Sequence, residues 1–357
     1  MSRPHRKNWM ISRSPNEGFI SMKKNIYTIT CSLIFISAIV LMNGCGKERQ
    51  KDLSEWQQKD GLVWNTSFHI TYRGSESLGD SALSVLARVG RSLSVFDSTS
   101  LVSKVNRQDS TLVDTDFIRV YVMSRKINRA SDGAFDPTLS PLITAWGFGK
   151  GHKANADTTR IDSIMNYVGI NKTHLHRDSI IKNDPRIEFN FSAIAKGYGC
   201  DAVAEMFEKN GVTDFLIEIG GEIMTGGKNK NGKKWRISID RPVLSSDRVI
   251  HESQEIIDIS GMGVATSGNY RNFHNTNGGT YGHTISAATG RPVSTDVISA
   301  TVIAPTAMEA DGLATAFMAM GSVKARKLNE SLRRPVMLVL SDSTTWTSTQ
   351  FNKLIVK

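Results

Sequence analysis

Two stretches of the chain carry most of the information, Phe189-Asn-Phe-Ser-Ala-Ile-Ala-Lys-Gly-Tyr-Gly-Cys-Asp201 and Glu309-Ala-Asp-Gly-Leu-Ala-Thr-Ala316. Each has the character of a loop or strand end that leads into a helix with polar residues where a packing helix would carry apolar ones. Asp311 and Thr315 are four residues apart, so on a helix their oxygen atoms lie on one face. This pair suits a hard cation such as Mg²⁺, which takes oxygen ligands and often a phosphate. The alternative is an acid in the first helical turn near an ordinary buried threonine.

The first stretch also predicts an anion site. Ser192 is a candidate N-cap for a helix from Ala193 to about Lys209, and the free N–H groups of a helix N-terminus bind anions. Lys196 follows one turn later and can add a positive charge for a phosphate. The alternative for Lys196 is a solvated helix lysine.

Six short motifs follow one another between roughly Val63 and Gly321. They are Ser131-Asp-Gly-Ala-Phe-Asp-Pro137, Ser192-Ala-Ile-Ala-Lys-Gly-Tyr198 ending at Asp201, Thr266-Ser-Gly-Asn-Tyr-Arg271, Tyr281-Gly-His283, Thr289-Gly290 and Ala304-Pro-Thr-Ala-Met-Glu-Ala-Asp311. Any one of them alone is weak evidence, whereas six in order are specific. In this order they resemble the ApbE family of FAD:protein FMN transferases.

The resemblance implies both an activity and a fold. We expect Mg²⁺-dependent transfer of FMN from FAD to a threonine or serine hydroxyl of a target protein, which forms a phosphodiester and releases AMP. The expected fold is α+β: an ApbE-like (T-fold-like) single domain with antiparallel sheets, flanking helices and two lobes around a flavin cleft. FAD is the expected substrate, Mg²⁺ the expected cation with Mn²⁺ as an alternative, and a subunit of a membrane redox complex the expected acceptor.

The resemblance further implies roles for individual residues. Asp311 and Thr315 would bind Mg²⁺ through their side chains, and Ala193 through its backbone carbonyl. Some relatives have a second acid where Ala314 stands, so water or phosphate would supply more of the coordination here. His283 and Asp311 are the expected catalytic residues. His283 would take the proton from the incoming hydroxyl, because histidine titrates near neutrality; the alternative is a core histidine.

The residues expected to contact FAD come from several parts of the chain. They are Trp64, Phe96, Ala134, Phe135, Asp136, Asn190, Lys196 and Ile285. Phe96 stands where relatives carry an aromatic against the isoalloxazine ring, and Trp64 where many carry methionine. Asn190 replaces a common aspartate and keeps a hydrogen-bonding side chain without the charge. The segment 134–136 is alternatively a simple turn before Pro137.

One departure from the family pattern affects the catalytic expectation. The chain reads His283-Thr-Ile-Ser-Ala-Ala-Thr-Gly290, in which Ser286 and Ala287 replace an Asp-Pro pair. Any role of that carboxylate is lost. This departure gives some support to an alternative function, a non-catalytic flavin-binding lipoprotein. Two more alternatives stay open: an FAD pyrophosphatase that yields FMN and AMP, which needs the same Mg²⁺ and diphosphate geometry, and a structural surface lipoprotein, which would leave the six motifs unexplained.

The N-terminus has the pattern of a lipoprotein signal peptide: a basic start, an apolar run from Ile26 to Met42, and a small residue before Cys45. We expect residues 1–44 to be the leader, with a natural start at Met22, and lipid on the Cys45 thiol. A polar tether would span 45–60. The alternative is a transmembrane anchor, for which a run of 17 residues is near the lower limit of length. The expected location is the periplasm-facing side of the bacterial envelope, on the inner rather than the outer membrane.

Charge and cysteine content narrow the function classes. The formal net charge is +10, and residues 1–44 account for half of it. The remaining excess is mild and lacks a basic cluster with interleaved aromatics, so we expect no nucleic-acid partner. The excess positive charge suits a phosphate-bearing ligand or anionic lipid.

The cysteine content leaves no disulfide in the mature chain. With Cys31 in the leader and Cys45 lipidated, Cys200 has no disulfide partner. It is expected to be a small buried residue rather than a catalytic thiol.

Residues 61–357 are expected to form one domain. Strands are expected at 68–72, 186–189, 215–219, 235–239, 255–259, 263–266, 298–304 and 335–340, and helices over 83–93, 114–127, 160–167, 193–209 and 307–320. Strands in clusters separated by isolated helices favour α+β. No Gly-x-Gly-x-x-Gly follows a strand, so the flavin site would not be of the Rossmann type.

Overall fold

The computed structural model describes residues 55–148, 160–240, 253–268, 273–276, 279–282 and 284–356. The strands are β1 (Trp56–Val63), β2 (Thr66–Arg73), β3 (Thr173–His176), β4 (Ser179–Lys182), β5 (Phe215–Ile219), β6 (Glu222–Gly226), β7 (Trp235–Asp240), β8 (Ser253–Ile259), β9 (Gly263–Gly268), β10 (Phe273–Thr276), β11 (Gly279–Gly282), β12 (Val297–Ala304), β13 (Val336–Leu340) and β14 (Thr345–Thr347). The helices are α2 (Ser77–Leu93), α3 (Leu101–Asn106), α4 (Thr115–Ala130), α5 (Ser140–Ala145), α6 (Ile161–Met165), α7 (Ala195–Lys209), α8 (Ala307–Leu332) and α9 (Thr349–Asn352), with a 3₁₀ turn, η2 (Ile170–Lys172).

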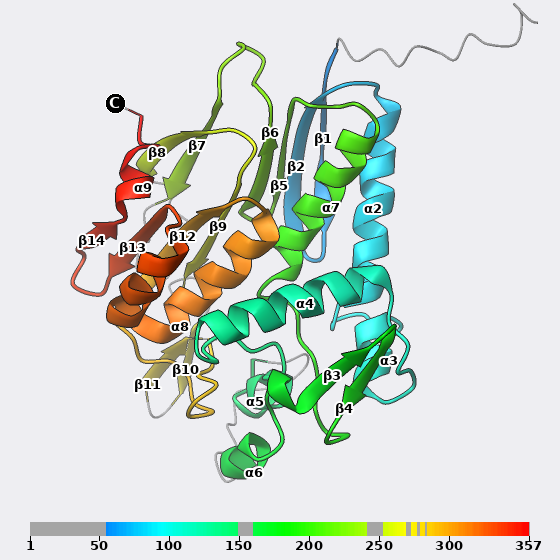
Figure 1. The fold of residues 1–357 in the computed structure, drawn as a ribbon, viewed down its shortest axis with the longest axis vertical. Coiled ribbons are helices and arrows are strands. Elements are labelled where there is room, and N and C mark those ends of the chain that lie inside the picture. The colour runs from blue at the N-terminus through cyan, green and yellow to red at the C-terminus, as the bar shows by residue number, and fades with distance from the viewer. Residues whose placement is uncertain are drawn as a thin grey trace, which may run out of the picture. The chain divides into compact units, whose positions relative to one another are not determined.

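An antiparallel sheet in the order β1-β2-β5-β6-β9-β12-β13-β14 forms the centre of the fold. Helices α7 and α8 pack on one of its faces, α7 over β5 and β6 and α8 over β9 and β12 (Figure 1). The two-stranded β7–β8 sheet packs on the other face. Mixed helices and antiparallel sheets confirm the expected α+β class.

Side-chain alternation along the strands explains why both faces are covered. In β13, Val336 and Leu338 belong to the cluster beneath α8, whereas Met337 and Val339 pack toward β7 and β8. Successive side chains of a strand point to opposite faces, so an apolar run of this kind requires a partner layer on each side.

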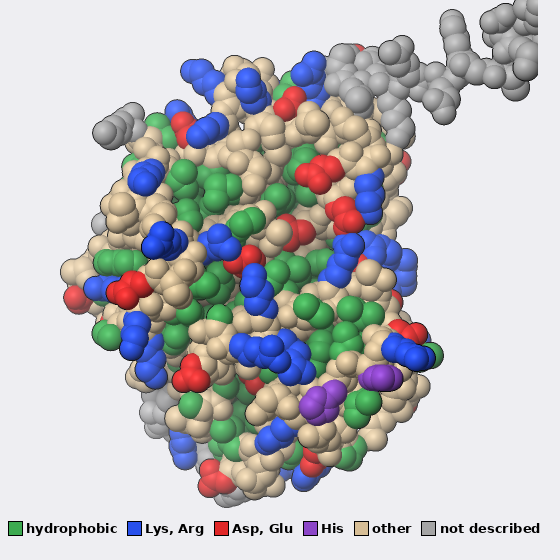
Figure 2. Space-filling view, in the orientation of Figure 1, with side chains coloured by type: hydrophobic (Ala, Val, Ile, Leu, Met, Phe, Trp, Pro, Cys, Tyr) green, Lys and Arg blue, Asp and Glu red, His purple; other side chains and the backbone are tan. Residues whose placement is uncertain are grey.

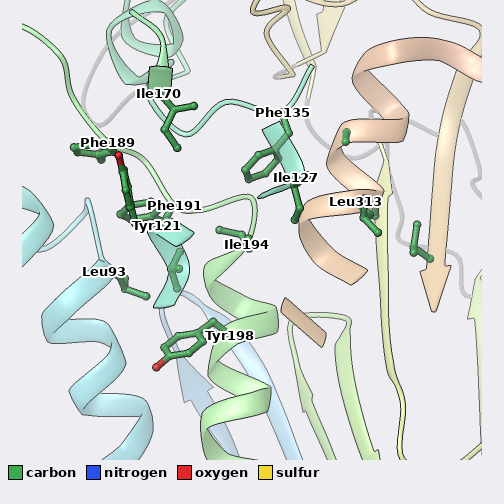
Figure 3. Packing of buried hydrophobic residues seen from close by; sticks show 14 of the residues in the cluster. Leu93, Tyr121, Ile127, Phe135, Ile170, Phe189, Phe191, Ile194, Tyr198 and Leu313 are labelled. Atoms are coloured by element: carbon green, nitrogen blue, oxygen red, sulfur yellow. The ribbon is translucent and has the colours of Figure 1, made fainter. Parts of the chain in front are cut away.

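The central apolar cluster holds the segment that leads into α7. Phe117 of α4 makes edge-to-face contacts with Phe189 and Phe191, with ring centroids 5.5 and 5.1 Å apart. Figure 3 shows these two rings near Tyr121 and Ile194, inside the cluster. Aromatic pairs in this geometry stabilise a core beyond the area they bury. The contacts fix the backbone on both sides of Asn190.

Several expected elements differ from those observed. Residues 186–189 form no strand: only Glu188 makes an isolated bridge, to Leu139, because the segment is packed by its phenylalanine rather than by a sheet partner. Strand β1 begins at Trp56, so the boundary placed at residue 61 lies inside it. No clear strand pattern is present in the sequence here, because β1 is an edge strand in which no residue is fully buried and polar residues are frequent.

Helix α8 continues beyond the expected end at Met320. The break comes at Gly321, whose φ of 76° is non-helical, and a further helical stretch runs to Leu332. The Asp296 carboxylate accepts the backbone N–H of Ser322 at 2.9 Å, which caps the second stretch. Glycine supplies the left-handed conformation at the break at little steric cost.

Basic and acidic side chains are interspersed on the face that carries α4, α7 and α8 (Figure 2). Several of them pair between helices. Arg119 of α4 donates to Glu205 of α7 at 2.5 Å, and Lys126 of α4 lies 3.7 Å from Glu309 of α8. None of the helices in the described ranges combines the length and the apolar character that a membrane span requires.

Candidate functional site

A cavity of about 1000 Å³ lies where α7, α8, the central sheet and the loops after α2 and α4 meet. Its volume is at the upper end of the range for ligand pockets. Ten of the residues expected in the site line it: Phe96, Ala134, Phe135, Asp136, Asn190, Ala193, Lys196, Ile285, Asp311 and Thr315. Tertiary structure thus brings together residues that lie more than 200 positions apart in the chain.

A group of oxygen atoms forms one part of the cavity wall. The Thr315 hydroxyl lies 3.5 Å from the Ala193 carbonyl oxygen and 3.1 Å from the Ser267 hydroxyl of β9. Asp311 precedes Thr315 by about one turn of α8 and is 3% exposed. The expected oxygen set of Asp311, Thr315 and Ala193 is therefore gathered at one place on the cavity wall.

Close contact between α7 and α8 fixes this arrangement. The backbone N–H of Gly197 donates to Asp311 Oδ2 at 3.1 Å. A Cβ atom at Gly197 would lie 2.3 Å from the Ala307 carbonyl oxygen, so only glycine permits the approach. The Asp201 carboxylate of α7 accepts the N–H groups of Ala307 and Met308 at 2.8 and 2.9 Å. It thereby caps α8 from the neighbouring helix.

Helix α7 begins two residues later than expected. Its N-cap is Ile194, which has no side-chain cap, so Ser192 is not the N-cap. The Ser192 N–H instead donates to the Asn190 side chain at 2.9 Å in a turn before the helix. This turn presents the Ala193 carbonyl to Thr315. The competing local bond explains the shift, because Asn side chains bond readily to the backbone two residues on.

Lys196 is paired with an acid that the sequence analysis did not include. Its ammonium group donates to Glu222 Oε2, and Glu222 is 3% exposed. Burial opposes the charge on Lys196, but the carboxylates of Glu222 and Asp311 outweigh it and raise its pKa. Burial raises the pKa of Glu222 and of Asp311, and Lys196 counteracts both shifts. Lys196 is thus a cavity-lining cation and not a solvated helix lysine.

Asp136 organises the loop after α4 as well as lining the cavity. Its Oδ1 accepts the Thr138 hydroxyl and N–H at 2.6 and 2.8 Å, and its Oδ2 accepts the Ile170 N–H at 3.0 Å. Burial raises its pKa, against the effect of these hydrogen bonds. The Asn190 N–H donates to the Pro137 carbonyl at 2.7 Å, which joins this loop to the segment before α7.

Apolar side chains occupy other parts of the wall. Phe96 is 52% exposed and lines the cavity, so its ring is accessible to a ligand. Phe135 is 2% exposed, and Figure 3 shows its side chain in the central cluster near Ile127. Phe135 therefore shapes the wall from within the core. Ile285 is 4% exposed and makes an isolated bridge with Pro292.

Trp64 is not among the cavity-lining residues. Its indole packs between α2 and α7, where Cβ atoms at Gly90 and Gly199 would each lie 2.6 Å from ring atoms. The expected flavin contact of Trp64 is therefore not seen. Trp64 is itself the first residue of the turn after β1, with a φ of 51°, and from this turn its ring packs against the two helices.

Two expected functional residues, His283 and Cys45, lie outside the described residues. Thr284, next in the chain after His283, lines the cavity. Cys200 is buried, and its thiol donates to the Glu222 carbonyl at 3.2 Å. Burial raises its pKa well above the ordinary value, which suits a packing role rather than a nucleophile.

Glu222 and Ser267 are the site residues that the sequence analysis missed. A signal for Glu222 was present, because it follows Gly220-Gly221 directly after the apolar strand β5. Both glycines have positive φ, 60° and 101°, as a two-residue hairpin with a primed turn requires. Ser267 lies inside the motif Thr266 to Arg271, which supported the family resemblance but gave no prediction for the Ser267 hydroxyl.

The donor set suits a hard cation. Asp311, Thr315 and Ala193 offer a carboxylate, a hydroxyl and a carbonyl, all oxygen, as Mg²⁺ prefers. Within the described residues there is no group of three or more His, Cys, Asp or Glu side chains placed to hold a metal ion. A cation at this wall would therefore need further oxygen from water or a ligand phosphate.

An α+β fold whose large cavity joins a lysine, an oxygen cluster and an accessible aromatic ring defines a protein suited to a large phosphorylated ligand. The chain belongs to the ApbE family, whose model matches residues 64–339. This confirms the resemblance given by the six motifs.

Individual relatives agree with this assignment. The chain is 32% identical to an FAD:protein FMN transferase of Vibrio cholerae, over 86% of this chain and 93% of that protein. It is also 32% identical to an FAD:protein FMN transferase of Haemophilus influenzae, over 82% and 90%.

Solved structures show the same fold. The flavin transferase ApbE from Vibrio cholerae superposes with a TM-score of 0.75 at 29% identity, covering 84% of this chain and 99% of that one. The apo form of the flavinyl transferase ApbE from Pseudomonas stutzeri gives a TM-score of 0.74 at 27% identity, over 85% and 99%. The expected fold class is confirmed.

Proposed function

We propose that this chain is an FAD:protein FMN transferase. The observation that carries the proposal is one cavity in which the Asp311–Thr315–Ala193 oxygen cluster, Lys196 and the accessible ring of Phe96 are combined. A flavin dinucleotide presents an aromatic ring and a diphosphate to such a surface. Relatives at 32% identity carry the same enzyme name.

The chemistry of the wall assigns the parts of FAD. The ring of Phe96 offers a stacking surface for the isoalloxazine, with Ala134 and Ile285 as apolar neighbours in the lining. Asp136 and Asn190 supply polar atoms that face the polar edge of the isoalloxazine ring and orient it in the cavity. Lys196 places a positive charge for the diphosphate.

The residues that would hold Mg²⁺ are Asp311, Thr315 and Ala193. A bound Mg²⁺ would offset negative charge that builds up on the diphosphate as AMP departs. The chain's own contribution is position: the Gly197 N–H fixes Asp311, and the turn before α7 presents the Ala193 carbonyl. Holding groups in place before reaction accounts for much of the acceleration in such transfers.

The transfer step is a substitution at the flavin-side phosphorus. The acceptor hydroxyl oxygen forms the new P–O bond, the bond from that phosphorus to the bridging oxygen breaks, and AMP leaves with the bridging oxygen. His283 accepts the hydroxyl proton. The product is FMN joined to the acceptor threonine or serine by a phosphodiester. The acceptor is a subunit of a membrane redox complex.

The test measures both products. The full chain is incubated with FAD, Mg²⁺ and a tagged acceptor protein carrying a flavinylation threonine, and in-gel flavin fluorescence is read together with AMP release. We expect fluorescent acceptor and AMP in equal amounts. Both should fall at least about 100-fold in Asp311→Asn, since the charge is lost while the shape is kept.

Glu330→Gln is the matched control, because Glu330 is an exposed acid on the same helix, away from the cavity lining. It should behave as the wild type. AMP without labelled acceptor would show a pyrophosphatase instead. FAD that stays bound and intact would show a flavin carrier, and failure to bind flavin would leave only a structural lipoprotein.

We further propose that the protein is lipid-anchored through Cys45 at the periplasm-facing side of the inner membrane. The support is the sequence pattern of residues 1–45 alone. Wild-type chain should incorporate radiolabelled palmitate and fractionate with membranes, whereas Cys45→Ala should incorporate none. Equal labelling of both would contradict the assignment.

A further inference from the structure

Glu222 is a buried acid on the cavity wall, and in the part of the chain that the structure describes Lys196 is its only partner in an ion pair. It is 3% exposed, whereas the Lys196 side chain is 32% exposed. Burying a carboxylate is costly unless it is paired. Glu222 therefore holds the ammonium group strongly, and the ammonium group keeps an open side toward the cavity.

The hairpin between β5 and β6 is shaped for this pairing. A Cβ atom at Gly220 would lie 3.3 Å from Lys196 Cδ and 2.7 Å from Thr66 Oγ1. The Glu218 carboxylate accepts the Gly221 N–H at 2.6 Å and holds the turn. The lysine stem therefore passes beside Gly220 and directs the ammonium group toward Glu222, the first residue after the turn.

A second carboxylate, that of Asp311, lines the same cavity as Lys196. Asp311 is joined to the residue after Lys196 by the Gly197 hydrogen bond, and its charge acts on Lys196. If the ammonium group paired with Asp311, it would repel a divalent cation at that carboxylate, because like charges at a few ångströms disfavour each other strongly in a partly buried site.

We propose that Glu222 is a positioning residue that holds the Lys196 ammonium group away from Asp311. Asp311 then stays available to a divalent cation, while Lys196 still faces the diphosphate. The inference rests on the proposed function in that it assumes a cation at Asp311. It assigns Glu222 no contact with that cation.

The test uses Mn²⁺ as the probe and needs no turnover. Electron paramagnetic resonance of free Mn²⁺ gives its Kd for the full chain without FAD. We expect Glu222→Gln to weaken Mn²⁺ binding roughly tenfold, a usual size for coupling between neighbouring groups. Adding Lys196→Met to Glu222→Gln should restore binding to within about threefold of wild type, because the competing cation is gone.

A third variant covers the case in which Glu222→Gln does not fold. Lys196→Met alone should bind Mn²⁺ at least as tightly as wild type, while its flavin-quenching Kd for FAD rises roughly tenfold. Glu205→Gln is the control, because it also removes a carboxylate paired with a cation on α7, but outside the cavity lining. Circular dichroism establishes that each variant is folded.

Three results would overturn the inference. The first is unchanged Mn²⁺ binding in Glu222→Gln. The second is weakened Mn²⁺ binding in Glu222→Gln that the added Lys196→Met does not restore, which would make Glu222 itself a ligand. The third is weaker Mn²⁺ binding in Lys196→Met alone. Transfer of FMN by the wild-type chain is measured separately. If transfer fails while the Mn²⁺ pattern holds, the proposed function is wrong and the positioning role stands; the reverse pattern leaves the function intact.

Discussion

The backbone N–H of Gly197 lies 3.1 Å from Asp311 Oδ2 and donates a hydrogen bond to it. This bond joins the two stretches that were most informative in the sequence, although 114 positions separate them. It sets the carboxylate orientation by backbone geometry, which a side-chain partner could not do as rigidly. Ala193, four residues before Gly197, then faces Thr315 across the same helix pair.

The Thr315 hydroxyl should matter more than its methyl group. Thr315→Val keeps the shape and removes the oxygen that lies 3.5 Å from the Ala193 carbonyl and 3.1 Å from Ser267. We expect FMN transfer to fall about tenfold or more, with a higher Mg²⁺ requirement, because one oxygen donor is lost. Thr315→Ser should retain most activity. The measurement is AMP release from each variant across a series of Mg²⁺ concentrations. Equal losses of activity in Thr315→Val and Thr315→Ser would point to packing instead.

Phe96 should contribute to FAD binding without contributing much to stability. Its ring is 52% exposed at the cavity, so Phe96→Ala removes a stacking surface and little core. We expect the Kd for FAD, measured by flavin fluorescence quenching, to rise roughly tenfold. Val323→Ala, which trims a residue that is 80% exposed, is the control and should leave the Kd unchanged. A Phe96→Ala chain with wild-type affinity would remove Phe96 from the flavin site.

Trp64 should act through packing between α2 and α7. Trp64→Leu is expected to lower the free energy of unfolding by about 2 kcal/mol and to leave the Kd for FAD within roughly twofold. Gly199→Ala should also destabilise, because its Cβ would lie 2.6 Å from the indole. The two changes together should cost less than their sum, since the smaller leucine relieves the clash. A large loss of FAD affinity with unchanged stability would restore the flavin role of Trp64.

The ion pair between α4 and α7 predicts a specific dependence of stability on pH. Hydrogen bonds from Arg119 and then Lys209 lower the pKa of Glu205 to about 2. The folded-state pKa lies below the unfolded value, so the stabilisation is present above about pH 4.5 and is lost as pH falls toward 2. Because the groups are partly exposed, we expect less than about 1 kcal/mol.

The measurement compares urea unfolding of wild type and Glu205→Gln from pH 7 downward. The difference in unfolding free energy should be largest at neutral pH and shrink below about pH 4.5. High salt should reduce it at pH 7, because exposed pairs are screened. A difference that grows on acidification would contradict the assigned direction.

The fold class, the two helices of the site and the oxygen donors on α8 could all be predicted from the order of residues. Alternation in the strands and the four-residue spacing of Asp311 and Thr315 are local properties, and local geometry follows from the order of residues. The six motifs likewise identified the family, because six short runs in a fixed order are far more specific than any one of them.

The partners of those residues could not be predicted in this way and became visible in the folded chain. Lys196 was expected to offer its charge to a phosphate, and no acid partner was predicted for it, yet it is paired with Glu222 across 26 positions. Trp64 packs against Gly90 and Gly199 rather than lining the cavity. Such contacts depend on how elements distant in sequence approach one another. Periodicity and spacing encode the conformation of a segment, whereas the neighbours of a side chain are set by the packing of the whole fold.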